Sequence, residues 1–119
     1  MPNQQFGPGG AFVGDPVNLM SGTVTANGSG AGLPCSSYTT ARLTLTVTAA
    51  TGTTPSMTVT VETSGDGTTG WASVGAFAAK TAPGTERKTV SGLDNYVRVS
   101  WAVTGTTPSF TASVAGVLL

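Results

Sequence analysis

One phrase of the sequence occurs twice and constrains the fold more than any other feature. Residues 51–61 read TGTTPSMTVTV, and residues 104–114 read TGTTPSFTASV. Each copy follows a run in which apolar and polar residues alternate, at 43–49 and 97–103. Alternation with a period of two is typical of a β-strand with one buried face. The repeat therefore predicts strands on both sides of a short break, once in each half of the chain.

The break itself carries turn residues. Gly52 and Gly105 can adopt a positive φ without a Cβ clash. Pro55 and Pro108 cannot donate to a strand ladder, and each pushes the preceding residue out of the right-handed helical region. The sequence thus predicts two strand–turn–strand hairpins at the centre of one domain.

The rest of the chain also indicates β-structure. Short alternating runs are separated by Gly, Asn, Asp and Pro, and no stretch has helical periodicity. This pattern predicts an all-β, antiparallel β-sandwich of jelly-roll or Ig-like type with about seven or eight strands. We expect the following side chains to face its interior: Leu43, Leu45, Val47, Met57, Val59, Val61, Val97, Val99, Trp101, Val103, Phe110 and Val114.

The first twenty residues differ from the remainder. Residues 1–20 combine backbone breakers, Gly and Pro, with large apolar side chains. We predict that they form an extended N-terminal arm and that 21–119 form the sandwich domain. The alternative is a tail that folds back along its own sandwich as an irregular edge. In the first interpretation the apolar residues of the arm bind a partner; these are Phe6, Phe12, Val13, Leu19 and Met20.

The composition excludes some classes of function and favours others. Charged residues are only 8% of the 119, and five Lys or Arg balance five Asp or Glu. A neutral, weakly charged β protein tends to associate with itself or a larger assembly, although Thr and Ser hydroxyls would also keep a monomer soluble. The basic residues are too scattered for nucleic acid binding, and no apolar run approaches the ~20 residues of a membrane-spanning helix.

Catalytic chemistry is hard to build from these residues. There is no histidine, which removes the commonest general base and metal ligand. Cys35 is the only cysteine and has no basic neighbour in the sequence to activate it. Asp66-Gly67 and Asp94-Asn95 are more typical of Asx turns than of a calcium loop. We therefore expect a protein that is not an enzyme and holds no cofactor or metal. The N-terminus also lacks the features of a signal peptide, which indicates synthesis in the cytoplasm.

Two aromatic residues leave a binding alternative open. Trp101 shares the parity of the buried strand positions, whereas Trp71 and Tyr96 are the candidates for exposed aromatics. Exposed aromatic rings can stack on sugars. Trp71 and Tyr96 are therefore candidate carbohydrate-binding residues.

Several segments resemble a known group of proteins. These are residues 44–71, which include the run ETSGDGTTGW, together with LDNYVRVSW at 93–101 and TGTTPSF at 104–110. They are similar to small β-sandwich virion proteins of tailed bacteriophages. The turn before Trp71 and the strand after Tyr96 are also similar to discoidin-like jelly rolls.

The resemblance implies a non-enzymatic capsid component. It suggests a decoration, or cement, protein that stabilises the head by bridging subunits of the major capsid protein. By analogy with such proteins we expect a homo-oligomer, a trimer rather than a dimer, located on the capsid surface of the virion after synthesis in the host cytoplasm. The alternative is a phage tail or adhesion module that binds carbohydrate through Trp71 and Tyr96.

Overall fold

The structure, a computed structural model, describes residues 5–6, 12–13 and 15–119. All of its regular elements are strands: β1 (Gln5–Phe6), β2 (Phe12–Val13), β3 (Asp15–Val24), β4 (Gly28–Ser29), β5 (Leu33–Pro34), β6 (Thr40–Ser64), β7 (Ala72–Ala76), β8 (Gly84–Ser91) and β9 (Tyr96–Leu118). Among these residues there is no helix that could cross a membrane. The predicted all-β, antiparallel class is confirmed.

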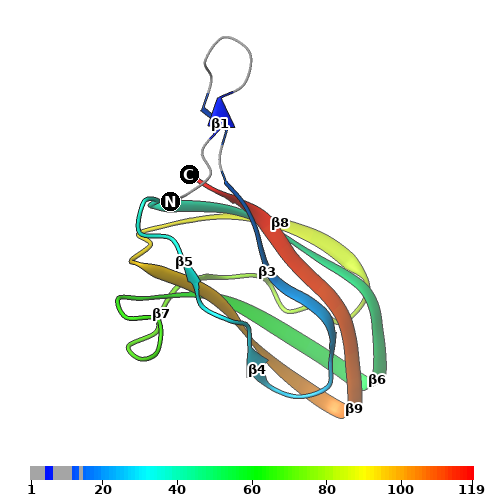
Figure 1. The fold of residues 1–119 in the computed structure, drawn as a ribbon. Helices are drawn as coiled ribbons and strands as arrows, with labels where there is room; N and C mark the ends of the chain where they lie inside the picture. Colours follow the sequence, from blue (N-terminus) through cyan, green and yellow to red (C-terminus); the bar gives the residue numbers. More distant parts are fainter. Residues whose placement is uncertain (1–4, 7–11, 14) are drawn as a thin grey trace.

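Two very long strands, β6 and β9, form the centre of the fold. They run antiparallel beside each other from Ala41 opposite Leu118 to Ser64 opposite Tyr96. Both strands reverse direction at the repeated phrase, so the pair folds over on itself like a bent ribbon (Figure 1). The two predicted hairpins are therefore wrong in one respect. The strands on either side of each turn do not pair with each other. The strand before the first turn pairs with the strand after the second, and the strand after the first turn pairs with the strand before the second.

The two bends contact each other in a reciprocal way. Gly52 and Gly105 both have φ of 115°. A Cβ on Gly52 would lie 2.8 Å from the carbonyl oxygen of Thr107, and one on Gly105 would lie 2.8 Å from that of Thr54. Thr54 and Thr107 themselves have φ of 47° and 46°, an uncommon conformation for a β-branched residue. The repeated phrase therefore builds one closed end of the molecule from two matching, strained turns.

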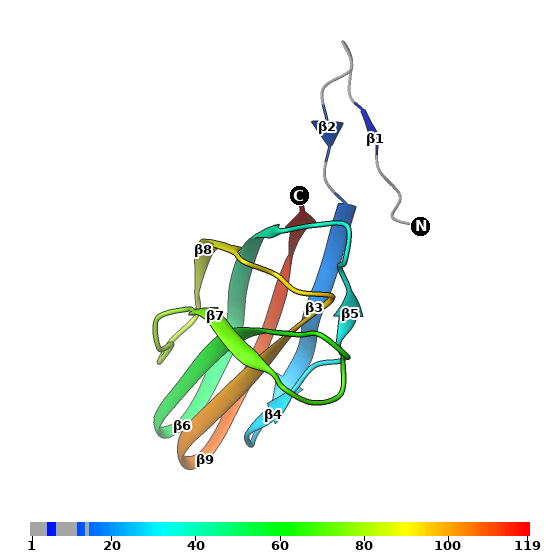
Figure 2. The ribbon, with the colours of Figure 1, turned by 90° about the vertical axis from the view of Figure 1, so that its left-hand side faces the viewer.

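The bends divide the continuous sheet into two layers, which are visible in Figure 2. Layer I consists of β3, the second half of β9, the first half of β6, and β8. Layer II consists of β4 and β5, the first half of β9, the second half of β6, and β7. Because each long strand contributes to both layers, the two faces of the core come from the same two strands.

The core lies between the layers and has the predicted composition. Ten of the residues expected to face inward have exposed fractions of 3% or less: Leu43, Leu45, Val47, Met57, Val59, Val61, Val97, Val99, Phe110 and Val114. Trp101 and Val103 are only partly buried and pack against this cluster.

The predicted boundary of the N-terminal arm at residue 20 is wrong. Strand β3 begins at Asp15 and forms an edge of layer I along β9. Leu19 and Met20, predicted to bind a partner, have exposed fractions of 4% and 5% and belong to the chain's own core. The register shifts between Asn18 and Met20, and such a bulge allows two consecutive side chains to point inward. Residues 15–20 therefore form an edge of the chain's own sandwich, which was the alternative interpretation.

The other three predicted partner-binding residues lie in β1 and β2. Phe6 pairs with Phe12, and Gln5 with Val13, in a two-stranded antiparallel ladder. In Figures 1 and 2 this β1–β2 ladder stands outside the sandwich, beyond the start of β3. The structure describes the backbone of these residues and not their side chains, so their role in partner binding stays a prediction.

Candidate functional site

The end of the sandwich opposite the bends carries most of the polar side-chain contacts. Here the loops around residues 35–39, 65–71 and 92–95 meet the start of β3 and the end of β9 (Figure 1). Two hollows of about 380 and 440 Å³ lie there and share Pro34 and Ser36 as lining residues. We call this region the open end. It is the candidate site because it combines hollows with polar groups.

A carboxylate–phenol contact fixes one side of the first hollow. The hydroxyl of Tyr38 donates a hydrogen bond of 2.5 Å to Oδ2 of Asp15. Tyr38 is buried, with 4% of its surface exposed. The other carboxylate oxygen, Oδ1 of Asp15, is buried without a hydrogen-bond partner among the residues that the structure describes. This contact ties the first residue of β3 to the segment that precedes β6.

Cys35 lines the first hollow and is a poor candidate for a reactive thiol. Its exposed fraction is 1%, and its Sγ donates to the carbonyl oxygen of Asp94 at 3.2 Å. Burial, with a smaller contribution from the negative charge of Asp94, raises the pKa of the thiol to about 11. The side chain is therefore a thiol at neutral pH and lacks the thiolate that a nucleophile or metal ligand requires.

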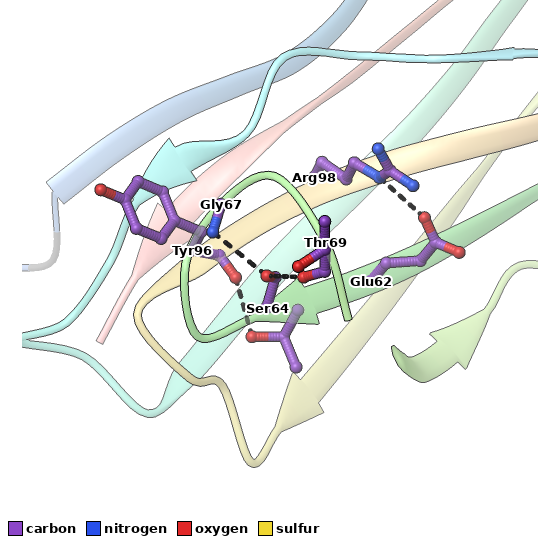
Figure 3. Close-up of polar contacts among 7 residues, drawn as sticks. Glu62, Ser64, Gly67, Thr69, Tyr96 and Arg98 are labelled. Atoms are coloured by element: carbon purple, nitrogen blue, oxygen red, sulfur yellow. Dashed lines mark hydrogen bonds and ion pairs between the residues drawn. The ribbon is translucent and has the colours of Figure 1, made fainter. Parts of the chain in front are cut away.

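The loop after β6 is held by its own side chains, as Figure 3 shows. Oγ of Ser64 donates to the carbonyl oxygen of Thr69 at 2.5 Å and accepts the N–H of Gly67 at 3.1 Å. Oδ1 of Asp66 accepts the backbone N–H groups of Thr68 and Thr69 at 2.9 and 2.8 Å. These hydrogen bonds hold the pKa of Asp66 well below its usual range. Asp66 thus forms the expected Asx-type turn.

The two predicted carbohydrate-binding aromatics lie against this same loop and are partly buried. The guanidinium carbon of Arg98 stands 4.1 Å from the centre of the Trp71 ring, and Arg98 also forms an ion pair of 2.9 Å with Glu62. A Cβ on Gly67 would lie 2.9 Å from the Tyr96 ring. One ring face of each aromatic is therefore occupied within the molecule, and their role in carbohydrate binding stays a prediction.

The open end offers hydrogen-bonding groups in shallow hollows. Within residues 15–119 and the short pieces of β1 and β2, no group of three or more His, Cys, Asp or Glu could hold a metal ion. The carboxylates of Asp15 and Asp66 already accept hydrogen bonds from neighbouring residues. Fold and site together define an all-β module in which these polar groups at the open end bond to neighbouring residues of the same chain.

Comparison with known proteins agrees on the fold. No protein-family model and no curated protein sequence matches the chain. Among solved structures, the crystal structure of the PBSX exported protein XepA, a phage protein, is similar with a TM-score of 0.63 and 15% sequence identity. The match covers 97% of this chain and 43% of XepA, so the chain spans less than half of its neighbour's length. At this identity the likeness shows a shared fold.

Sequence reasoning missed two contacts at the open end. The Asp15–Tyr38 hydrogen bond joins residues 23 positions apart, and nothing in their local sequences indicates it. The Glu62–Arg98 ion pair, in contrast, could have been predicted from the repeat in the sequence. If the two copies of the repeat pair with each other antiparallel about the bend, Glu62 falls opposite Arg98, as observed.

Proposed function

We propose that this chain is a structural protein of a phage particle that decorates the capsid and stabilises it by bridging subunits of the major capsid protein. In this proposal it acts by binding alone, without catalysis or a cofactor. The observation that carries the proposal is the β1–β2 ladder, which projects from the sandwich (Figure 2).

The ladder argument rests on stability. An isolated two-stranded ladder is marginal in water and usually needs a third strand or a packing surface. The β1–β2 ladder has two residue pairs, Gln5–Val13 and Phe6–Phe12. The ladder precedes β3 in the chain, and the ten residues of β3 pair along β9. A neighbouring subunit that supplied a third strand or an apolar surface would stabilise the ladder and be held to the sandwich by it.

The surface and the fold support the same proposal. Charged residues make up 8% of the chain and its net charge is zero, which provides little repulsion between copies packed at high density. The fold is shared with XepA, a phage protein. We further propose that the chain acts as a homo-oligomer on the capsid surface, a trimer rather than a dimer, after synthesis in the host cytoplasm.

Co-sedimentation with purified phage heads tests the proposal. The chain should pellet with heads, and a variant lacking residues 2–14 should pellet much less because it has lost the ladder while keeping β3. A variant in which residues 2–14 are replaced by a Gly/Ser segment of equal length is the matched control and should behave like the deletion. Equal binding by all three proteins would contradict the bridging role, and no binding by the intact chain would contradict the function.

The deletion also tests the corrected boundary of the sandwich. Removing 2–14 should leave the melting temperature nearly unchanged, whereas removing 2–24 takes away β3 with its buried Leu19 and Met20. Each large apolar side chain contributes roughly 1.5–3 kcal/mol on full burial, so the longer deletion should melt far lower. Thermal unfolding followed by circular dichroism measures both.

A carbohydrate-binding tail or adhesion module is the second candidate. The observation that favours it is the hollow of about 440 Å³, which places Tyr96 beside polar side chains of Asp66, Asn95 and Ser36. Glycan-array binding that is lost in Tyr96→Ala and retained in Phe77→Leu, a buried substitution away from the hollow, would support this candidate. No binding to any glycan would remove it.

A further inference from the structure

Two of the five Lys and Arg side chains form an ion pair with a carboxylate of the described residues. Lys80 pairs with Glu86 at 2.5 Å, and Arg98 pairs with Glu62 at 2.9 Å. The positive charge of Lys88 also acts on Glu86, and its side chain runs alongside Gly75. Arg42 and Arg87 remain, both exposed and without an ion pair to any residue between 15 and 119.

The strand register puts these two arginines on one outer face. In layer I, Arg42 lies opposite Thr89, and Thr44 lies opposite Arg87. Positions two apart on a strand share a face, so Arg42, Thr44, Arg87 and Thr89 form a square with the arginines on one diagonal. We call this the arginine square. Directly opposite Cβ atoms on neighbouring strands are about 5 Å apart and diagonal residues roughly 7–8 Å. Both guanidinium groups can therefore reach the same anionic group.

The rows of the square continue across β9 as Val117 and Ala115, whereas the row beyond it carries hydroxyl groups. The next row across the face consists of Ser21, Ser113, Thr46 and Thr85. Thr23 and Thr111 follow, with their hydroxyls 2.9 Å apart. None of the five carboxylates lies at an outward position of this face: Glu86, on β8, is opposite the buried Leu45, and Asp15, on β3, is opposite the buried Leu118. The positive charge of the face is therefore not compensated.

We propose that the outer face of layer I is a docking surface for an acidic protein surface, with the arginine square binding partner carboxylates. This inference rests on the proposed function and names the face that the sandwich turns toward its partner on the particle. The guanidinium fork matches a carboxylate in a bidentate geometry, and the hydroxyls of Thr44 and Thr89 add donors to the same oxygens. The short Ser and Thr side chains of the neighbouring row allow a second surface to approach the arginines closely.

The number of cations favours a protein over a nucleic acid. A protein that binds duplex DNA through its backbone can make about 6–10 phosphate contacts, each with a Lys or Arg. The face supplies two arginines and no lysine. A protein interface, in contrast, needs only a few well-placed charged contacts within a larger complementary area. Carboxylates on an otherwise neutral partner are the ligand that two arginines suit.

Adjacent residues on β8 provide a matched pair of variants. Arg87 points outward into the square, while Lys88 lies opposite the buried Leu43 on the other face of the same strand. Arg87→Gln and Lys88→Gln therefore change the net charge equally, one residue apart, on opposite faces. Arg42→Gln provides the second member of the square.

The first experiment uses a fluorescein-labelled ten-residue polyglutamate peptide and measures fluorescence anisotropy at low salt. The intact chain should bind the peptide, with affinity falling as salt rises. Arg42→Gln and Arg87→Gln should each weaken binding about threefold, consistent with single exposed charge pairs, while Lys88→Gln should bind like the wild type. Absence of binding, or equal losses in Arg87→Gln and Lys88→Gln, would overturn the proposal. Tighter binding of a 20-base-pair DNA duplex through the same residues would overturn the proposal that the partner is an acidic protein surface.

The second experiment repeats head co-sedimentation with the double variant Arg42→Gln/Arg87→Gln. Reduced binding relative to wild type and to Lys88→Gln supports the docking face. Undiminished binding of the double variant to heads that do bind the wild type overturns the inference and leaves the proposed function standing. If the wild type does not bind heads, the proposed function fails and the peptide experiment still tests the face. Self-association of the free chain that disappears in the double variant would assign the face to a second copy instead.

Discussion

The reciprocal bends give the sharpest prediction about stability. Gly105 has φ of 115°, and an added Cβ would lie 2.8 Å from the carbonyl oxygen of Thr54. A residue with a side chain held in such a backbone conformation costs about 1–3 kcal/mol, and the contact with a backbone oxygen adds to this because neither group can rotate away. Gly105→Ala should therefore lower the free energy of unfolding by at least that amount. Gly52→Ala should do the same, since its environment at Thr107 matches.

Urea denaturation of the two single variants and the double variant measures these losses. Gly84→Ala is the control, because its Cβ would meet no atom within 4 Å and its φ is not in the strained range; it should change stability by less than about 0.5 kcal/mol. Since each glycine contacts the other bend, the two losses should not add, and the double variant should lose less than their sum. A Gly105→Ala protein as stable as Gly84→Ala, or losses that add within about 0.3 kcal/mol, would refute the reciprocal contact.

Three further outcomes follow from the core and the open end. Leu45→Ala, at a fully buried position, should lower the free energy of unfolding by about 2–5 kcal/mol in urea denaturation. A decrease under about half a kcal/mol would mean that Leu45 does not face the core. Because the pKa of Cys35 is raised to about 11, the unfolded thiol ionises first, so stability should fall as pH rises from about 8.5 toward 11; Cys35→Ala should lack this fall. The pKa of Asp66 is lowered, so the stabilisation from its turn should be present above about pH 4 and be lost as the pH falls further. Asp66→Ala should then be less stable than the wild type at pH 7 and approach it near pH 2, and equal pH profiles for the two proteins would contradict the assignment.

Local patterns in the sequence were sufficient for the class of fold and most of its core. Period-two alternation identified the inward faces of β6 and β9 because each half-strand has one buried side. The turn chemistry of the repeat also located the bends correctly. The same reasoning could not decide which strands pair, because a tight turn between two strands is compatible with a hairpin and with a fold-over between layers. The pairing of the two bends depends on contacts between Gly52 and Gly105 and residues more than fifty positions away.

The N-terminal boundary and the open end show the same limit. Residues 15–20 contain Pro16 and lack clear alternation, and an edge strand tolerates both features. The bulge that buries Leu19 and Met20 together has no signal in the sequence. At the open end, Arg98 covers Trp71 only because the two long strands bring Glu62 and Arg98 side by side. Exposure of an aromatic residue therefore could not be inferred from its position after a turn.

Cryo-electron microscopy of phage particles that contain this chain tests the central claim most directly. The account predicts density for the two-layered sandwich on the outer surface of the head, with the β1–β2 ladder contacting a neighbouring subunit and the outer face of layer I against an acidic surface. Particles whose heads carry no such density, or in which the chain is found on the tail alone, would contradict it.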